Sequence, residues 1–268
     1  MRRIASAGVL PGTALIMAGA LLAGCSTPSG SGPAWTAEPK DSGATAMASP
    51  DGSASAGASS ATTPAASGSA TAGPAATASA WKTFSDPAKT VAFELPETWI
   101  AQSVPPEEGT LPGALKIEVK KPDGTFVAAL RTGLPPSSPD CPADARRPYT
   151  VLSSVPVELS AEGGEGTIPP RVVFRAIQGY RFFGSYGITN IVGGADGQAC
   201  ELRNIVRGPA DKGDYSFGDL VSVRAFAPDE KVEPAKAFDT LDQAATYASE
   251  SADFANVQRM LMSLEIKN

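Results

Sequence analysis

Apolar and polar residues alternate along much of the chain after Trp81, which is the pattern of strands with one buried and one exposed face. Residues 91–95 alternate in this way up to Pro96. Residues 115–120 alternate as well, and residues 126–130 follow them after the turn sequence Pro122-Asp123-Gly124. An Asp-Gly pair supplies the positive φ that a tight turn needs. The pattern therefore predicts a strand over 91–95 and a β-hairpin over 115–130.

A second hairpin is expected in the middle of the chain. Residues 172–176 alternate and lead into an aromatic-rich stretch, residues 180–188, and the glycine-rich sequence 193–197 then turns the chain so that Cys200, Leu202 and Val206 return. A further strand is predicted over 220–226. Residues 155–159 form another candidate strand, and Pro156 would place it at a sheet edge because proline cannot donate a ladder hydrogen bond.

Near the C-terminus the spacing of apolar residues changes from that of a strand to that of a helix. Thr240 and Gln243 have the spacing of a capping box, which predicts a helix start. Two groups of apolar residues with helical spacing follow, separated by a break over 249–253. The first group is Leu241, Ala244, Ala245 and Ala248, and the second is Phe254, Val257, Met260, Leu261 and Leu264. The expected fold is α+β, a mostly antiparallel sheet with a C-terminal helix packed on one face.

Residues 26–80 have a different composition, dominated by Ala, Ser, Gly, Thr and Pro. Such a stretch buries too little apolar surface to offset its ordering entropy. We therefore predict a disordered tether over 25–80 and one globular domain over 81–268.

The N-terminus carries Arg2 and Arg3, an apolar run over 4–23 and the sequence Leu22-Ala23-Gly24-Cys25. This arrangement resembles the signal peptide and lipobox of bacterial lipoproteins. The resemblance implies that residues 1–24 are removed and that Cys25 carries lipid, which would anchor the protein at the extracytoplasmic face of the cell membrane. An ordinary secretory signal, cut after Ala20, is the alternative. A spanning helix is disfavoured by the glycines and proline within the run.

The globular part resembles the PsbP/Mog1-like family. The resemblance lies in Phe84-Ser85-Asp86, in the stretch 91–99 with its Pro96 and Trp99, and in the terminal apolar positions 254–264. It covers the two ends of the domain and departs in the middle. It implies an α+β fold and a non-enzymatic protein that binds protein partners, but it assigns no binding residue.

Composition narrows the possible functions. The formal net charge is −6, and loss of Arg2 and Arg3 makes it −8, which argues against nucleic acid as a partner. The absence of histidine excludes His-based triads and imidazole metal sites, and we expect neither a cofactor nor a metal. Cys141 and Cys200 remain once Cys25 is assigned to lipid. Outside the cytoplasm such a pair predicts a disulfide, since no Cys-x-x-Cys spacing indicates a redox site.

Three other motifs are interpreted as structural. Gly184-Ser185-Tyr186-Gly187 lacks the spacing of a nucleophile elbow and any histidine base. The Asp-Gly pairs at 123–124 and 196–197 lack the alternating oxygen ligands of a calcium loop and are expected to form turns. Glu162 and Glu165 are expected to be solvated loop carboxylates. No catalytic residue is therefore predicted.

One possible binding surface is an aromatic stripe. Tyr180, Phe182 and Tyr186 are expected on one strand face, with Arg175 and Arg181 on the other parity or beside it. The stripe is either core beneath the helix or an apolar groove. Two functions therefore stay open, a tethered module that binds or scaffolds another envelope protein and a carrier or sensor of a small apolar ligand or lipid. A histidine-free enzyme is a more distant third.

Overall fold

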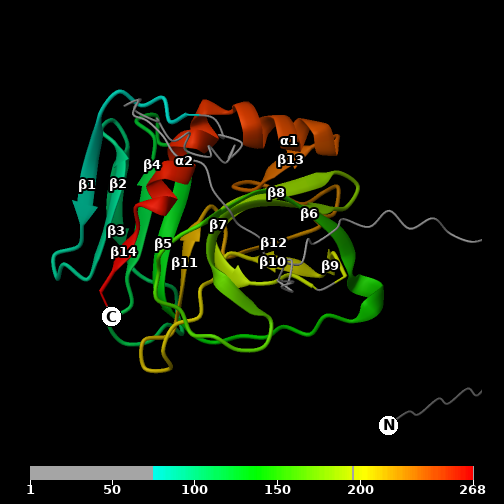
Figure 1. Ribbon diagram of the computed structural model, residues 1–268, viewed down its shortest axis with the longest axis horizontal. Coiled ribbons are helices and arrows are strands. Elements are labelled where there is room, and N and C mark those ends of the chain that lie inside the picture. The colour runs from blue at the N-terminus through cyan, green and yellow to red at the C-terminus, as the bar shows by residue number, and fades with distance from the viewer. Residues whose placement is uncertain (1–74, 195, 268) are drawn as a thin grey trace, which may run out of the picture. The chain divides into compact units, whose positions relative to one another are not determined.

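The computed structural model describes residues 75–194 and 196–267 (Figure 1). The strands in this part of the chain are β1 (Trp81–Ser85), β2 (Val91–Pro96), β3 (Ile100–Val104), β4 (Lys116–Lys120), β5 (Phe126–Leu134), β6 (Arg147–Pro156), β7 (Thr167–Gln178), β8 (Phe182–Ile191), β9 (Gln198–Ala199), β10 (Glu201–Arg203), β11 (Asp214–Gly218), β12 (Ser222–Arg224), β13 (Lys236–Phe238) and β14 (Glu265–Ile266). The helices are α1 (Leu241–Glu250), α2 (Ala252–Met262) and a 3₁₀ turn, Ala143–Ala145. The lipobox and most of the predicted tether lie outside the described residues.

A large antiparallel sheet forms the centre of the domain. Its strands follow the order β3-β4-β5-β11-β8-β7-β6-β9, and β13 pairs with the start of β8. A smaller sheet of order β1-β2-β14 brings the C-terminal strand beside an N-terminal one. The short strands β10 and β12 pair with each other in a third sheet. The described part of the chain is therefore an α+β domain with antiparallel pairing, as the sequence predicts.

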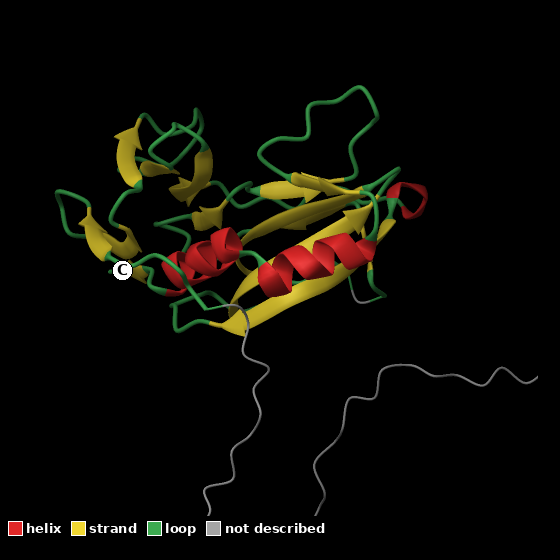
Figure 2. Cartoon of the chain, turned by 90° about the horizontal axis from the view of Figure 1, so that it is seen from above, coloured by secondary structure: helices red, strands yellow, loops and turns green. Residues whose placement is uncertain are grey.

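The two helices follow one another along one side of the sheet (Figure 2). Thr240 caps α1 by accepting from the N–H of Gln243 at 3.2 Å, and Ser251 caps α2 by accepting from the N–H of Phe254 at 3.2 Å. Both the predicted helix start and the predicted break are confirmed. The apolar face of α2 is buried in the main core together with residues from β2, β4, β5, β7, β8 and β11.

The opposite face of the sheet buries a second, smaller core. Its members are Ile177, Phe183, Ala199, Leu202, Val223 and Ala235. Because β8 is covered on both faces, most of its residues are buried, the polar ones included. This burial on both faces determines the surroundings of the site described below.

The first predicted hairpin is confirmed, because β4 pairs with β5 and Ile117 lies opposite Leu130. The second is correct only in part. Strands β7 and β8 do form a hairpin, but the chain that returns after residues 193–197 pairs with β12 instead of β8. The second edge of β8 is occupied by β13 at residues 182–184 and by β11 at Gly187. The returning chain meets β8 beyond them, where the N–H of Asn190 donates to the carbonyl of Ile205 at 3.1 Å.

Two strand boundaries also differ from expectation. The strand expected over 155–159 ends at Pro156 and extends the other way, from Arg147. Its first two residues pair with β9, and the N–H of Tyr149 donates to the carbonyl of Gly197. From residue 150 on, it pairs with β7 alone in the part of the chain that the structure describes, so most of it lies at an edge. The strand expected over 220–226 is confined to Ser222–Arg224.

The chain just before Trp81 is fastened to α2. The side-chain oxygen of Asn256 accepts from the N–H groups of Thr77 and Ala78 at 2.9 and 3.1 Å. The indole of Trp81 donates to the carbonyl of Ala78, and the Arg259 guanidinium lies 3.9 Å from the centroid of the Trp81 ring. Residues 77–81 are therefore held against α2.

Candidate ligand-binding cavity

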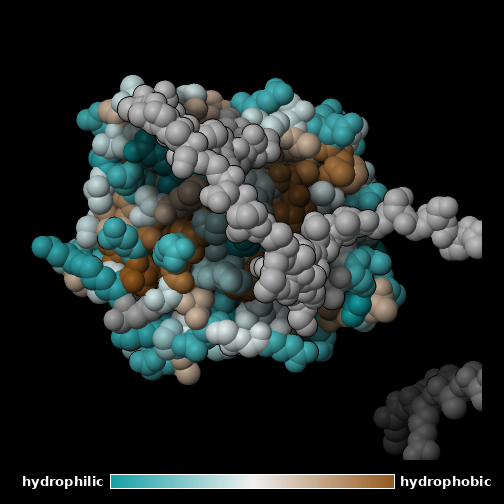
Figure 3. All heavy atoms as spheres, viewed as in Figure 1, coloured by the Kyte–Doolittle hydropathy of each residue, from teal (hydrophilic) through white to brown (hydrophobic). Residues whose placement is uncertain are grey.

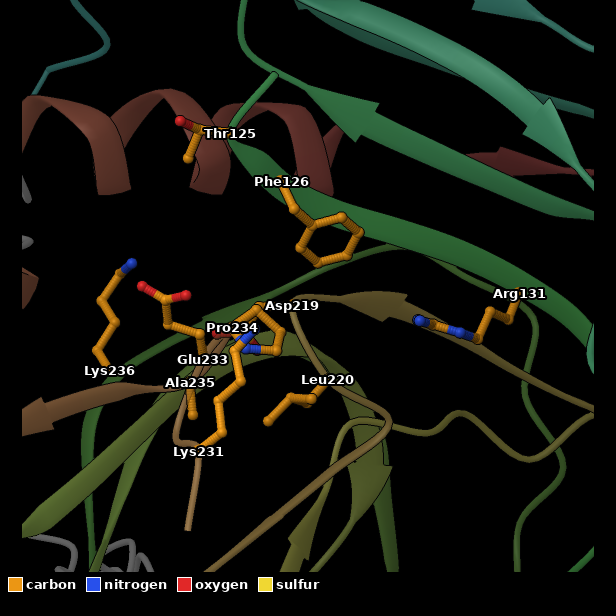
Figure 4. Close-up of a pocket in the computed structure, with 10 residues that line it drawn as sticks. All are labelled: Thr125, Phe126, Arg131, Asp219, Leu220, Lys231, Glu233, Pro234, Ala235 and Lys236. Atoms are coloured by element: carbon orange, nitrogen blue, oxygen red, sulfur yellow. The ribbon is translucent and has the colours of Figure 1, made fainter. Parts of the chain in front are cut away.

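The domain contains a cavity of about 750 Å³ that is open to solvent. It lies between the start of β5, the loop after β11 and the segment that leads into β13. Figure 4 shows the side chains that line it, which are Thr125, Phe126, Arg131, Asp219, Leu220, Lys231, Glu233, Pro234, Ala235 and Lys236. Five of these ten side chains are ionisable, so the cavity is suited to a polar or charged molecule.

Asp219 is the most unusual of them, because this carboxylic acid is only 1 % exposed. The hydroxyl of Ser185 and the N–H of Tyr186, at 3.2 Å, both donate to Oδ1 of Asp219. Its other oxygen, Oδ2, has no hydrogen-bond partner among the described residues. Burial raises the pKa of Asp219 to about 7, against the opposing effects of the Ser185 hydrogen bond and the Lys236 charge. An unsatisfied buried acceptor is costly, which makes it a candidate contact for a ligand.

Asp219 is held by a line of buried polar side chains that we call the Arg175–Asp219 network. Asn204 Nδ2 donates to Ser185 Oγ at 2.8 Å, and Arg175 Nη2 donates to Asn204 Oδ1 at 3.0 Å. Burial lowers the pKa of Arg175 to about 10, so its guanidinium keeps its charge at neutral pH. The network connects a buried cation in β7 to the carboxylic acid at the cavity, and it fixes the orientation of that acid.

Three cations also line the cavity, and they differ in their partners. Arg131 is paired with Glu107, whose Oε1 lies 2.9 Å from Arg131 Nε. Lys231 and Lys236 have no carboxylate within ion-pair distance among the described residues, and Lys231 is exposed. The Lys236 ammonium lies 5.7 and 5.3 Å from the ring centroids of Tyr186 and Tyr247. The two lysines are therefore available to a ligand anion.

A smaller hollow of about 60 Å³ adjoins the cavity, with which it shares Thr125, Phe126 and Lys236. Its other walls include Trp99, Val127, Tyr186, Tyr247 and Val257, beneath α2. Lys121 and Asp253, an ion pair with 2.7 Å between Nζ and Oδ2, complete its lining. This inner hollow is therefore partly polar and has room for a small side group only.

The predicted aromatic stripe is not a single surface. Phe182 and Tyr186 have the same parity in β8, and the Tyr186 hydroxyl donates to the carbonyl of Val127 at 2.9 Å. Tyr180 lies in the turn before β8, is 51 % exposed, and its ring packs against Phe183, which belongs to the second core. The expectation that all three residues share one strand face is therefore wrong, because the strand begins only at Phe182.

The two arginines expected beside the stripe lie in different surroundings and do not form one surface. Arg175 is buried in the network described above, whereas Arg181 pairs with Asp239 at 2.8 Å. Of the five predicted surface residues, Tyr186 lines the inner hollow and none lines the main cavity. Sequence reasoning missed Asp219 and Lys236. The available signal was the position of Asp219 directly after the sequence Tyr215-Ser216-Phe217-Gly218.

The remaining motifs are found as follows. Ser185 is 1 % exposed and donates to Asp219, so its hydroxyl is not open to a substrate. Gly124 and Gly197 have φ of 85° and 72°, and both Asp-Gly pairs form turns, as predicted. Glu162 and Glu165 are exposed in the loop before β7. Among the described residues no cluster of His, Cys, Asp and Glu could hold a metal ion.

Cys141 and Cys200 are joined by a disulfide, with their Cα atoms 5.6 Å apart. This predicted bond is therefore present in the structure. It links the loop after β5 to the start of β10, 59 residues later. Within the described residues, no helix is both long and apolar enough to span a membrane.

Comparison with protein-family models finds no match, and neither curated proteins nor solved structures match this chain. The functional interpretation therefore depends on the geometry of the site itself.

Proposed function

We propose that this chain is a lipoprotein of the bacterial cell envelope, anchored through lipid on Cys25 at the extracytoplasmic face of the membrane, whose α+β domain binds a small ligand. The lipobox resemblance at 22–25 supports the anchor. The turn from Pro96 to Trp99 and the terminal helical segment support membership of the PsbP/Mog1-like family. Binding, not catalysis, is the function that the cavity supports.

The observation that carries the binding function is Asp219. A buried carboxylic acid with one unpartnered oxygen lines an open cavity, and a four-residue network holds it in place. Retaining such a group lowers stability, because burial penalises the charged form and the free oxygen lacks a donor. A ligand that donates to Oδ2 would remove the second of these costs.

The cavity, however, differs from the apolar pocket expected for a lipid carrier. Its charged walls favour a small polar ligand, and the inner hollow combines aromatic side chains with the Lys121–Asp253 ion pair. The sequence-based alternative is therefore retained in a modified form, as a binding protein for a small polar molecule.

The binding function is tested by recovering the ligand. The full chain would be purified in detergent, exposed to a small-molecule extract of bacterial cells, washed and denatured, and the released molecules identified by mass spectrometry. Thr125→Trp should weaken the capture because the indole occupies part of the cavity beside Phe126, whereas Thr246→Trp on the exposed side of α1 should not. Absence of any specifically released molecule would overturn the binding function.

The anchor has its own test. Cys25→Ser should move the protein from the membrane fraction to the soluble or uncleaved fraction, as judged by fractionation and mass. A serine variant that is processed and retained like the parent would contradict the assignment.

A second candidate function is docking of another envelope protein, and the outer side of β6 favours it. Among the described residues, 150–156 pair with β7 alone, and Val151 on this edge strand is 49 % exposed. Hydrophobic patches interrupt the mostly hydrophilic face seen in Figure 3. Open strand edges can accept a further strand. Val151→Lys should abolish docking and leave small-molecule capture unchanged.

A further inference from the structure

The acidic residues of the cavity favour a ligand with a positively charged hydrogen-bond donor. Asp219 Oδ2 is a buried acceptor without a partner among the described residues, and Glu233 lines the same cavity as an exposed carboxylate. A purely anionic ligand would leave Oδ2 unsatisfied and would place its charge beside these two acids. An ammonium group can donate to Oδ2, is attracted by the Glu233 carboxylate and favours the ionised form of Asp219.

The lysines of the cavity favour a ligand that also carries an anionic group. Lys231 and Lys236 flank Glu233 in the sequence, line the cavity and have no carboxylate partner among the described residues. In Figure 4 the side chains of Glu233 and Lys236 point into the same open space, and Arg131 lies at the far side. A purely cationic ligand would be repelled by the two lysines, and an uncharged apolar ligand would leave all four groups without partners.

Arg131 shares Glu107 with Lys116, each 2.9 Å from Oε1, so the lining side chains without an ion-pair partner among the described residues are two acids, Asp219 and Glu233, and two bases, Lys231 and Lys236. We propose that its ligand is a zwitterion, an amino acid or a short peptide, whose ammonium group binds Asp219 and whose carboxylate binds Lys231 and Lys236. This inference rests on the binding function proposed above and specifies its ligand. The inner hollow of about 60 Å³ receives the short side chain of the ligand between Phe126, Tyr186 and Tyr247.

Calorimetric titration of the full chain tests the assignment of each charge. The 20 common amino acids, with their homodipeptides, are screened first, and the tightest binder is compared with its N-acetyl and amide derivatives, which lack the ammonium and the carboxylate. Each derivative should bind about tenfold more weakly or worse, since one charge-assisted hydrogen-bonding group is lost. Comparison of the free amino acid with its dipeptide shows which of the two is the ligand.

Variants assign the partners. Asp219→Asn keeps an oxygen that accepts from Ser185, so it should fold, and it should weaken binding of the zwitterion about tenfold or more. The double variant Lys231→Met, Lys236→Met should remove the preference for the free acid over the amide. Asp229→Asn, in an exposed turn and not among the residues that line the cavity, is the matched control and should bind like the parent.

The outcomes separate this inference from the binding function. If the extract yields a bound molecule that lacks an ammonium or a carboxylate, the zwitterion is wrong and the binding function stands. If no amino acid or dipeptide binds, or if the blocked derivatives bind as tightly as the parent compound, the inference is overturned. If the extract yields nothing, both fail together.

Discussion

A single carboxylic acid dominates the chemistry of the domain at the residue scale. In the unfolded chain the pKa of Asp219 is that of an ordinary aspartate, 3.8, and burial raises it to about 7 in the folded protein. Between these pH values the folded state holds a proton that the unfolded state releases. The free energy of unfolding therefore falls as pH rises through this window, by an amount on the order of 4 kcal/mol.

Asp219→Asn removes this dependence. The variant should gain stability relative to the parent as pH rises from 5 to 8, measured by urea unfolding at intervals of one pH unit. Lys236, the nearest opposing charge, remains in both proteins, so the difference reports on Asp219. Asp229→Asn should leave the profile of the parent unchanged, and parallel profiles for Asp219→Asn and the parent would show that Asp219 is not the group responsible.

Strand β8 shows at the element scale why the Arg175–Asp219 network can form. At Gly187 a Cβ atom would lie 2.6 Å from Cβ of Asn204 and 3.0 Å from the carbonyl oxygen of Phe217. Glycine is therefore required here for close approach of the neighbouring chain. Without it, Asn204 could not reach Ser185.

Gly187→Ala should destabilise the domain by about 1–3 kcal/mol through overpacking. It should also weaken ligand binding, because displacement of Asn204 releases the Ser185 hydroxyl that orients Asp219. Gly163→Ala is the matched control, since a Cβ at that position meets nothing within 4 Å. Denaturant unfolding measures the first effect and ligand titration the second. Equal stability of the two variants would refute the close approach.

The sequence predicted the elements whose signals, such as alternation, turn residues and helix caps, lie within one short stretch of the chain. The β4–β5 hairpin carries strict alternation and an Asp-Gly turn, and the helices carry Thr240 and Ser251 at their N-caps. By contrast, β11 and β13 are short, and their pairing with β8 depends on residues far away in the sequence. The cavity is built by these same non-local pairings, which explains why Asp219 and Lys236 escaped prediction while Tyr186 was only partly understood.

The disulfide constrains the molecule as a whole. Cys141 and Cys200 close a loop of 59 residues, which stabilises a fold by about 4 kcal/mol in the chain-entropy model. In folded protein both thiols should resist alkylation until a reductant is added, as read by mass spectrometry. Reduction should also lower the free energy of unfolding. Free thiol at both positions in protein taken from membranes would show that the bond does not form in the cell.

Binding of a small ligand beside Asp219 is the central claim about the whole molecule, and amide chemical shifts test it most directly. The ¹⁵N-labelled chain would be titrated with the amino acid and dipeptide panel. Ligand binding in the cavity should give saturable shifts at Phe126, Asp219, Leu220 and Lys236, and these shifts should be lost in Asp219→Asn. Saturable shifts confined to residues outside the cavity, or no saturable shift with any member of the panel or with the cell extract, would contradict it.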